Sequence, residues 1–590
     1  MTGTTTSKTY SSTAIETKIS YTVAMPQPSS HLFEVTLQIS NWQKDLLDLK
    51  MPVWTPGSYL VREYAKNLQG FRAKNSSNNR FLSSYKISKN YWQINTGNCA
   101  DITVNYQVFA NELTVRTNHL DTTHGYFNGA ALFFFIPGLE KQAIELKIVP
   151  PQPDWQISTT LDSCQDEANT FRAKDFDTLV DTPVEIGIHK LYNFEVLGKP
   201  HQLAIWGKGN ANAEQIIADT QKIIEVEANL YDGLPYEKYL FILHLSGSGY
   251  GGLEHKESCS LNYPRFGFKK KDKYNRFMQL VAHEFFHLWN VKRIRPKVLE
   301  KFDYEKENYT TSLWFSEGTT SYYDNLIPLR AKIYDRKTCL ENFSKDITKY
   351  LNTPGRKIQP LGESSFDAWI KLYRRDANSD NNQISYYLKG ELVSLLLDLL
   401  IRAKHNNKKS LDDVMSRMWT DFGKNEIGFS PQQLREVIES VAATDLSDFF
   451  HRYIDTTEEL PFDEYLEPFG LKLKAIAADE PIPELGIKVQ SENNQEVIKF
   501  VEANSPSAIA GIDPGDILLA IDGFRVTAEL LSDRLKDYRV DDPIEVTIFH
   551  QDELKTLSVK LAKPQPTSYE IVRLENPSLP QQQNLSAWLS

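Results

Sequence analysis

Two histidines and a glutamate spaced along one helical turn give the strongest chemical signal in the sequence. In the segment His283-Glu284-Phe285-Phe286-His287 the histidines stand four residues apart. Both imidazoles therefore lie on one face of a helix and can reach a single metal ion. Phe277 and Val281 fall on roughly the opposite face, which is free to pack. The HExxH pattern also arises by chance in long helices, so a zinc site needs support from a further ligand.

A third ligand is available thirty residues beyond His287. A catalytic zinc site keeps three protein ligands and an open position for water, and Glu317 is far enough along the chain to begin a second helix and return its carboxylate to the ion. Most glutamates are solvated. Glu317, however, stands between Leu313-Trp314-Phe315 and Tyr322-Tyr323, and a carboxylate in such apolar surroundings is paired or coordinated.

These residues carry a family resemblance. The segment HEFFHLWN followed by WFSEGTTSYY resembles the gluzincin metallopeptidases, in which two histidines and a downstream glutamate hold zinc. The resemblance implies one zinc ion per chain, bound by His283, His287 and Glu317, with Glu284 as general base. Four further features narrow the resemblance to one family of these peptidases. They are the stretch VKRIRP, the long gap to Glu317, the PVWTPGSYL stretch at residues 52–60 and a PDZ-like C-terminus. The chain is similar to glycyl aminopeptidases that carry a C-terminal PDZ domain.

A glycine-rich motif upstream of the histidines suggests how substrate would bind. The segment Gly251-Gly252-Leu253-Glu254-His255 is similar to the GAMEN motif of zinc aminopeptidases, in which the glutamate binds the α-amino group of the substrate. Glu254 is thus the candidate amine ligand, with Gly251 and Gly252 beside it. His255 departs from the asparagine of the motif, which puts the neighbouring backbone contacts in doubt. The run Gly247–Gly252 also satisfies GxGxxG, but Pro264 and the lack of a helical apolar period disfavour a dinucleotide site.

A second motif suggests the group that stabilises the oxyanion. The segment Tyr387-Leu388-Lys389-Gly390 is similar to the YxKG element of the same peptidases, which implies that Tyr387 donates to the developing negative charge. The adjacent Tyr386 is an alternative donor. Tyr387 is favoured because its distance from Gly390 matches the motif.

Together these residues predict a zinc-dependent aminopeptidase that acts on peptides with a free N-terminus. In this hypothesis the zinc ion lowers the pKa of a bound water toward about 7, and Glu284 passes the proton of that water to the leaving amine. The resemblance implies a preference for N-terminal Gly or Ala. Two alternatives remain open: a zinc endopeptidase, and a non-catalytic scaffold whose zinc is structural and whose PDZ-like groove binds peptides.

The hydrophobic pattern divides the chain into regions that would position this site. Apolar residues alternate with period two up to about residue 200, as in half-buried strands. Helical spacing follows from Ala213–Tyr231 to about residue 460, and it includes a long predicted helix across Arg276 to Asn290. The sequence therefore predicts a multidomain α+β protein, with an N-terminal antiparallel β domain (1–205) and a thermolysin-like, α-rich zinc peptidase domain (206–470). The sequence also predicts a PDZ-like, β-rich module (475–563), whose strands follow the proline-containing stretch 479–483. A flexible tail (564–590) is predicted to follow this module.

The loop that opens the C-terminal module suggests peptide binding. The segment Glu484-Leu485-Gly486-Ile487 resembles the carboxylate-binding loop of PDZ domains, in which backbone N–H groups hold a C-terminal carboxylate. Leu485, Gly486 and Ile487 are thus candidate ligands for C-terminal peptides. A structural lid or spacer is an equally weighted alternative.

Composition excludes several other partners. The 66 basic and 77 acidic residues give a net charge of −11, which disfavours nucleic acid. The four cysteines form no CxxC pair and are expected to be free thiols in a reducing compartment. No secretory leader is visible, and the most apolar run, 392–401, is shorter than the roughly 20 residues a membrane span needs. These features predict a cytoplasmic protein that does not enter a membrane.

Overall fold

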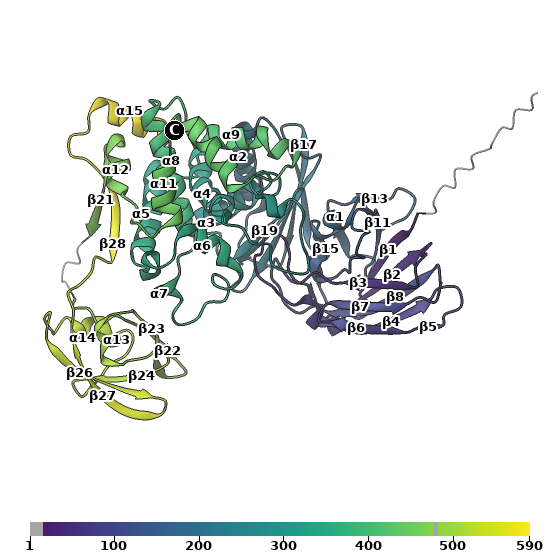
Figure 1. Ribbon diagram of the computed structural model, residues 1–590, viewed down its shortest axis with the longest axis horizontal. Helices are drawn as coiled ribbons and strands as arrows, with labels where there is room; N and C mark the ends of the chain where they lie inside the picture. Colours follow the sequence, from purple (N-terminus) through teal and green to yellow (C-terminus); the bar gives the residue numbers. More distant parts are fainter. Residues whose placement is uncertain (1–15, 477–481) are drawn as a thin grey trace, which may run out of the picture.

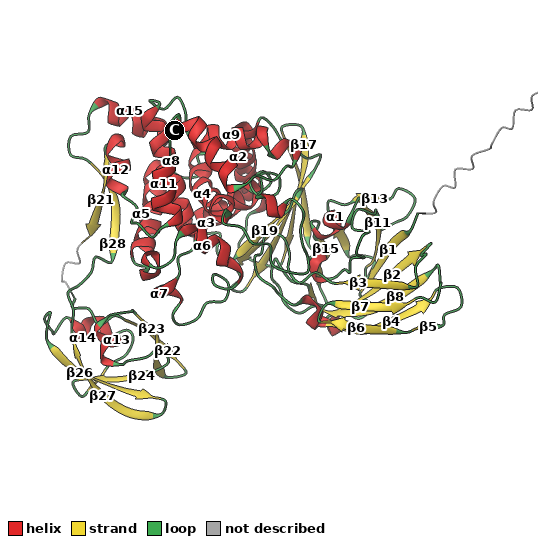
Figure 2. Ribbon diagram, viewed as in Figure 1, coloured by secondary structure: helices red, strands yellow, loops and turns green. Residues whose placement is uncertain are grey.

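The computed structural model describes residues 16–476 and 482–590, and these form a β-rich N-terminal region, a helical centre and a small C-terminal module (Figure 1). The helices gather in the centre, while strands occupy both ends of the molecule (Figure 2). The predicted N-terminal start and most of the predicted linker, Asp479-Glu480-Pro481, lie outside the described residues. The fold class is therefore the predicted mixture of an N-terminal β domain, an α-rich centre and a small β-rich C-terminal module.

The period-two pattern of the N-terminal region produces a large sheet in the order β13-β14-β11-β1-β2-β8-β4-β5. Tyr21 of β1 pairs with Leu37 of β2, and both side chains are buried on the same face. The pairings are antiparallel except that β1 runs parallel to β11. The bounds of these strands are β1 Lys18–Ala24, β2 Leu32–Ser40, β4 Leu68–Asn75, β5 Phe81–Leu82, β8 Ile102–Phe109, β11 Ile144–Val149, β13 Asp162–Ser163 and β14 Thr170–Ala173.

Two smaller sheets complete the N-terminal region. One has the order β3-β7-β6 and the other the order β12-β15-β10-β9. The second packs its strands β10 and β15 toward the centre of the molecule, where Tyr126 of β10 hydrogen-bonds with Ser260 of the next sheet at 2.8 Å. The bounds are β3 Leu46–Lys50, β6 Ser84–Ser88, β7 Tyr91–Asn95, β9 His119–Leu120, β10 His124–Phe127, β12 Gln156–Ser158 and β15 Val184–Gly187.

A mixed sheet in the order β16-β17-β18-β20-β19 supports the helical centre. Strands β17, β18 and β20 run parallel, and β18 and β20 are almost fully buried, as the strands of a sheet covered on both faces are. The edge strand β19 pairs antiparallel with β20 and carries Glu254 at its end. The bounds are β16 Lys190–Val196, β17 Lys199–Trp206, β18 Tyr239–Ser246, β19 Gly251–Glu254 and β20 Ser258–Pro264.

The helices of the centre begin where the sequence places capping residues. Ser410 and Ser430 form capping boxes at the starts of α9 and α10, and Pro431 opens α10. The predicted helix at Ala213–Tyr231 has those bounds in the structure as α2. The other main helices are α3 Lys271–Phe286, α4 Thr319–Arg330, α5 Arg336–Leu351, α6 Leu361–Phe366, α7 Ser379–Asn382, α8 Tyr386–Lys404, α9 Leu411–Asp421, α10 Pro431–Ala442, α11 Ser447–Phe450 and α12 Phe462–Leu466.

The C-terminal module is a β-rich unit with its own apolar core. Its sheet has the order β22-β23-β24-β26-β27, with β25 on β24, so β22 is an edge strand. Asn381 of α7 joins it to the centre by hydrogen bonds with the backbone of Val501 and Ala503. The bounds are β22 Ile487–Glu492, β23 Gln495–Val501, α13 Pro506–Ala510, β24 Ile517–Ile521, β25 Phe524–Arg525, α14 Leu531–Leu535, β26 Pro543–His550 and β27 Glu553–Lys560.

The predicted flexible tail at 564–590 is ordered, and this expectation was wrong. Strand β28 (Ser568–Arg573) pairs with β21 (Leu471–Ile476), and helix α15 (Leu579–Trp588) packs on the helical centre. Trp588 is buried, and its indole N–H donates to the Tyr322 hydroxyl at 3.1 Å. The tail has few apolar residues, so it gains its structure from contacts with the rest of the chain.

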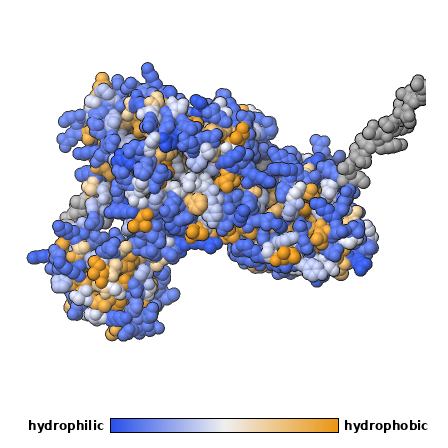
Figure 3. Space-filling view, viewed as in Figure 1, coloured by the Kyte–Doolittle hydropathy of each residue, from blue (hydrophilic) through white to orange (hydrophobic). Residues whose placement is uncertain are grey.

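The surface drawn in Figure 3 is mostly hydrophilic, with apolar side chains in small separate groups. Across 16–476 and 482–590, no helix combines the length and apolar character that crossing a membrane requires.

Candidate metal and catalytic site

Helix α3 presents the two histidines and Glu284 to a cavity because its other face is packed. Phe277, Val281 and Phe285 are buried against the core. The helix begins at Lys271, earlier than the predicted Arg276, and ends at Phe286, with His287 as its C-terminal cap. The imidazoles of His283 and His287 lie edge to face, with ring centres 4.6 Å apart. They therefore share one helix face, as their spacing predicts.

Glu317 lies beside both histidines. It belongs to the π-helical turn Trp314–Gly318, which leads into α4, and its side chain is almost fully buried. Its Oε2 atom is 3.7 Å from Nε2 of His283 and 3.2 Å from Nε2 of His287. The three side chains thus bring three metal-ligating atoms within 4.8 Å of one another.

The second nitrogen of each imidazole is held by a hydrogen bond. Nδ1 of His287 is 2.7 Å from the carbonyl oxygen of Asn290, and Nδ1 of His283 is 2.9 Å from Oδ2 of Asp324. Since these partners are acceptors, each Nδ1 carries the proton and each Nε2 keeps its lone pair. This is the arrangement of metal-binding histidines in proteins. The donor set of two imidazoles, one carboxylate and a cavity opening suits a catalytic zinc ion.

The chain after His287 turns sharply to make this arrangement possible. The predicted helix to Asn290 is interrupted, and Val291 has a φ of 108°, which is uncommon for a β-branched residue. The side-chain amide of Asn290 donates to the carbonyl oxygens of Phe315 and Ser316. Asn290 therefore ties the histidine helix to the turn that carries Glu317.

Two glycines allow backbone segments to approach the acidic groups of the site. A Cβ atom on Gly252 would lie 2.1 Å from the carboxylate carbon of Glu284, and one on Gly57 would lie 2.5 Å from Oε1 of Glu254. Gly57 also has a positive φ of 87°. Gly57 belongs to the N-terminal region, so that region forms part of the site. Gly251 also lies in the cavity wall, within the extended strand β19. A dinucleotide site would instead require the glycine-rich segment to begin a helix.

Glu254 and Glu284 are buried carboxylates in the same cavity. Oε1 of Glu254 and Oε2 of Glu284 have no hydrogen-bond partner within the described part of the chain. Burial raises the pKa of the Glu284 carboxyl; His283 opposes this effect and Glu254 adds to it. Burial alone would also raise the pKa of Glu317, but the neighbouring His287 and His283 lower it below its usual value. Glu284 is thus poised to exchange a proton and Glu317 to stay ionised.

Tyr387 and Tyr386 differ in their relation to the cavity. Tyr387 lines it, with its ring stacked 6.2 Å from that of His283, and its hydroxyl is 3.1 Å from the Tyr373 hydroxyl. Tyr386 is fully buried and does not line the cavity. Of the two candidates, Tyr387 is therefore the one that can reach a bound substrate.

The cavity has a volume of about 1230 Å³, which is large enough for a peptide. Arg116 reaches it from the N-terminal region and donates to the carbonyl oxygen of Gly252 at 3.2 Å. Arg116, Tyr373, Asp324 and Gly57 are site residues that sequence reasoning missed. Asp324 could have been found, because it follows Glu317 by two helical turns; Arg116 gives no local signal.

In the C-terminal module, the predicted peptide-binding loop leads into an edge strand of the sheet. Gly486 has a φ of 79°, and Ile487 begins the edge strand β22. The backbone N–H groups of Leu485 and Gly486 donate to no other residue in the described ranges. These N–H groups are thus available to a carboxylate.

Comparisons with known proteins identify the class and the family. Sequence profiles match residues 20–188 as Peptidase M61 N-terminal domain, 276–393 as M61 glycyl aminopeptidase and 483–561 as PDZ domain. An aminopeptidase N family protein from Idiomarina loihiensis is 32% identical, with a TM-score of 0.90, and the alignment covers 97% of this chain and 100% of that one. An M1 zinc metallopeptidase from Deinococcus radiodurans is 11% identical over 75% of this chain and 94% of its own, with a TM-score of 0.47. No curated protein matches.

The fold and the matched domains define a metallopeptidase. The chain belongs to the M61 glycyl aminopeptidase family and carries a C-terminal PDZ domain.

Proposed function

We propose that this peptidase is a zinc-dependent aminopeptidase that removes small N-terminal residues, Gly or Ala, from peptides. His283, His287 and Glu317 would hold one zinc ion in the cavity. When bound there, zinc supplies a Lewis acid and lowers the pKa of coordinated water toward about 7. The name of the matched family supports the preference for N-terminal glycine.

The chain's own residues account for the remaining steps. Glu284, whose pKa is raised by burial, accepts a proton from water and returns it to the leaving amine. Tyr387 donates a hydrogen bond to the carbonyl oxygen of the scissile peptide as that oxygen gains negative charge. Asp324 and Asn290 keep the two imidazoles in the tautomer that leaves Nε2 free.

The observation that carries the aminopeptidase proposal is the free, buried carboxylate of Glu254. Its Oε1 atom has no hydrogen-bond partner among the described residues, although it lies in the cavity that contains the histidines. A substrate ammonium group would pair with it and relieve the cost of burying the charge. A peptide with a blocked N-terminus has no such group, so it should bind poorly.

Hydrolysis of matched peptides tests this assignment. Wild-type protein should cleave Gly- and Ala-peptides with free N-termini and cleave their N-acetylated forms far more slowly. Glu254→Gln should lower kcat/KM for the free peptides by about 30- to 5,000-fold, because truncating one partner of a buried charge pair costs about 2–5 kcal/mol. Equal rates on free and acetylated peptides would instead indicate an endopeptidase.

A second function belongs to the C-terminal module. We propose that the loop Leu485-Gly486-Ile487 binds C-terminal carboxylates of peptides, with the peptide adding a strand to the edge of β22. The free N–H groups of Leu485 and Gly486 support this proposal. Calorimetry with peptides that end in a carboxylate or an amide provides the test, because only the carboxylate form should bind.

A further inference from the structure

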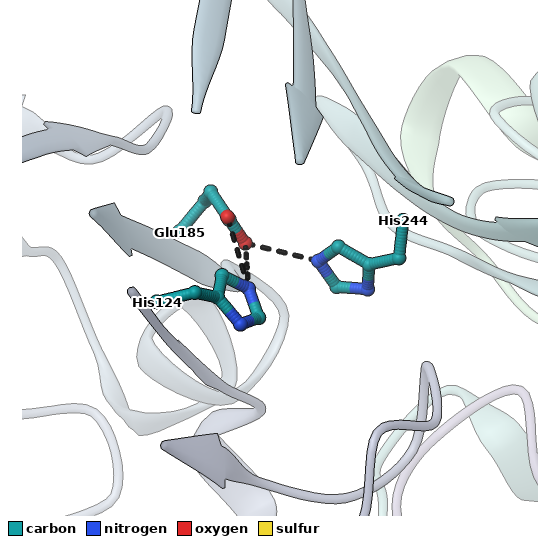
Figure 4. A group of neighbouring side chains, drawn as sticks. All are labelled: His124, Glu185 and His244. Carbon is teal, nitrogen blue, oxygen red and sulfur yellow. Dashed lines mark hydrogen bonds and ion pairs between the residues drawn. The ribbon is translucent and has the colours of Figure 1, made fainter. Parts of the chain in front are cut away.

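A second group of metal-ligating side chains lies away from the catalytic cavity, where the N-terminal region meets the mixed sheet. His124 comes from β10, Glu185 from β15 and His244 from β18. Figure 4 shows both imidazoles pointing toward the carboxylate. All three side chains are fully buried. These three residues are called the interface cluster below.

The distances within the interface cluster match those of a metal site. Nε2 of His124 is 3.0 Å from both carboxylate oxygens of Glu185, and Nε2 of His244 is 3.0 Å from Oε2. A tetrahedral zinc ion with bonds of about 2.0–2.1 Å places its ligand atoms about 3.3 Å apart. The corresponding distances in the catalytic set, 3.2 and 3.7 Å, are similar.

His189 lies beside the interface cluster but is not one of its three ligating residues. Its Nε2 atom lies 2.8 Å from the Ser158 hydroxyl, which orients the ring, and its Nδ1 atom lies 3.7 Å from Oε1 of Glu185. That separation is too long for a hydrogen bond. Nδ1 of His189 and Oε1 of Glu185 therefore face each other without a hydrogen-bond partner among the described residues, and both are fully buried.

Hydrogen bonds among the described residues leave Oε1 of Glu185 without a partner. A buried acceptor left unsatisfied costs about 1–3 kcal/mol. A cation bound between Glu185 and the Nε2 atoms of His124 and His244 would satisfy this oxygen and offset the negative charge of the carboxylate.

We propose that His124, His244 and Glu185 hold a second zinc ion, distinct from the catalytic one. Two imidazoles and one carboxylate suit zinc. Because all three side chains are fully buried, substrate cannot reach the ion, so the ion is structural. The chain would then bind two zinc ions, not the single ion that the sequence predicts.

The position of this ion gives it a role in assembling the active site. Its ligands join β10 and β15 of the N-terminal region to β18, which lies two strands from the Glu254-bearing strand β19. The N-terminal region supplies Gly57 and Arg116 to the catalytic cavity. A metal link at this interface would hold that region in place against the peptidase domain.

Zinc content of the full-length protein tests the proposal. After dialysis against zinc and removal of free metal, the wild type should contain two ions per chain. The double variant His283→Ala/His287→Ala, which lacks the catalytic site, should retain one. A wild type with one ion and a double variant with none would overturn the proposal, and this result would leave the catalytic assignment intact.

Variants of the interface cluster give an independent measurement. In the His283→Ala/His287→Ala background, zinc should raise Tm, because a ligand that binds only the folded state stabilises it. Adding His124→Gln and His244→Gln should abolish both the shift and the retained ion. Adding His119→Gln instead provides the matched control, because its ring lies 5.3 Å from that of His124 but its Nε2 atom pairs with Asp121. An unchanged Tm shift in the cluster variant would contradict the proposal.

Discussion

At the scale of single residues, the site depends on which polar atoms face the cavity. Nδ1 of His283 and Nδ1 of His287 each form a hydrogen bond, so the Nε2 atoms are left for the proposed metal ion. Two basic residues after His287 form ion pairs outside the cavity: Lys292 pairs with Asp181 at 2.5 Å, and Arg295 pairs with Glu426 at 3.2 Å. His255 also faces Asp181, at 3.5 Å, rather than the catalytic carboxylates.

The two adjacent tyrosines should respond differently to loss of the hydroxyl group. Tyr387→Phe should lower kcat by about 10²–10³-fold, which is the usual cost of removing one donor to a developing oxyanion, while zinc content stays unchanged. Tyr386→Phe is the matched control and should retain nearly full kcat, because Tyr386 does not line the cavity. Steady-state kinetics on a Gly-anilide distinguishes the two variants. A larger loss in Tyr386→Phe would reverse the assignment.

Spacing alone could predict part of this site. The positions of His283 and His287 follow from the period of a helix, and Glu317 stands out because apolar residues surround it. Arg116 could not be predicted, because it comes from a region more than a hundred residues upstream and reaches the cavity only after the domains pack. Gly57 lies in the PVWTPGSYL stretch that carries part of the family resemblance, but no local pattern places that stretch at the cavity.

At the scale of elements, the site requires two helical segments to cross closely. The turn that carries Glu317 and helix α8, which carries Tyr387, meet at two glycines. A Cβ atom on Gly318 would lie 2.5 Å from Cα of Gly390, and one on Gly390 would lie 2.7 Å from the carbonyl oxygen of Trp314. Gly390 therefore allows α8 to approach, which gives a physical reason for the glycine in the Tyr-Leu-Lys-Gly segment.

Replacing Gly390 with alanine should destabilise the protein although it adds a better helix former. The overpacked contact should cost about 1–3 kcal/mol, lowering Tm, and should reduce kcat as Tyr387 shifts. Gly362→Ala in α6 provides the control, since its Cβ atom would meet no atom closer than 3.6 Å; this change should be neutral or stabilising. Thermal unfolding of both variants tests the argument, and a stabilised Gly390→Ala protein would contradict it.

Element boundaries were predictable where local signals are strong. Capping residues and a clear apolar stripe define α2, α9 and α10. The start of α3 was less clear, because its first turn contains lysines that read as a solvated surface segment. Its end depends on a backbone turn that serves the metal site, which propensity cannot anticipate.

At the scale of the whole molecule, the N-terminal region and the tail both pack on the helical centre. The tail was wrongly predicted to be flexible, because its Pro, Gln and Ser content is typical of loosely held segments. Its helix nevertheless has a capping box at Ser578, and Trp588 stacks against Phe343 with ring centres 6.0 Å apart. The order of the tail is thus a tertiary effect that local composition conceals.

Removal of the Trp588 side chain should measure how firmly the tail is held. Trp588→Ala should cost about 3–5 kcal/mol, as large-to-small changes at buried aromatic positions do, and should expose the tail to proteolysis. Leu579→Ala in the same helix is the control, because its side chain is 66% exposed. Limited proteolysis and thermal unfolding provide the readouts. Equal resistance of Trp588→Ala and wild type would mean that the tail does not contribute to stability.

The most direct test of the account is the hydrolysis of Gly- and Ala-anilides by Glu284→Gln, with zinc content measured on the same sample. Glu284 is not a metal ligand, so the variant should bind the same amount of zinc as the wild type. Its kcat should fall by about 10²–10⁴-fold, the usual contribution of a general base. Hydrolysis at the wild-type rate by pure, zinc-loaded Glu284→Gln would contradict the assigned mechanism.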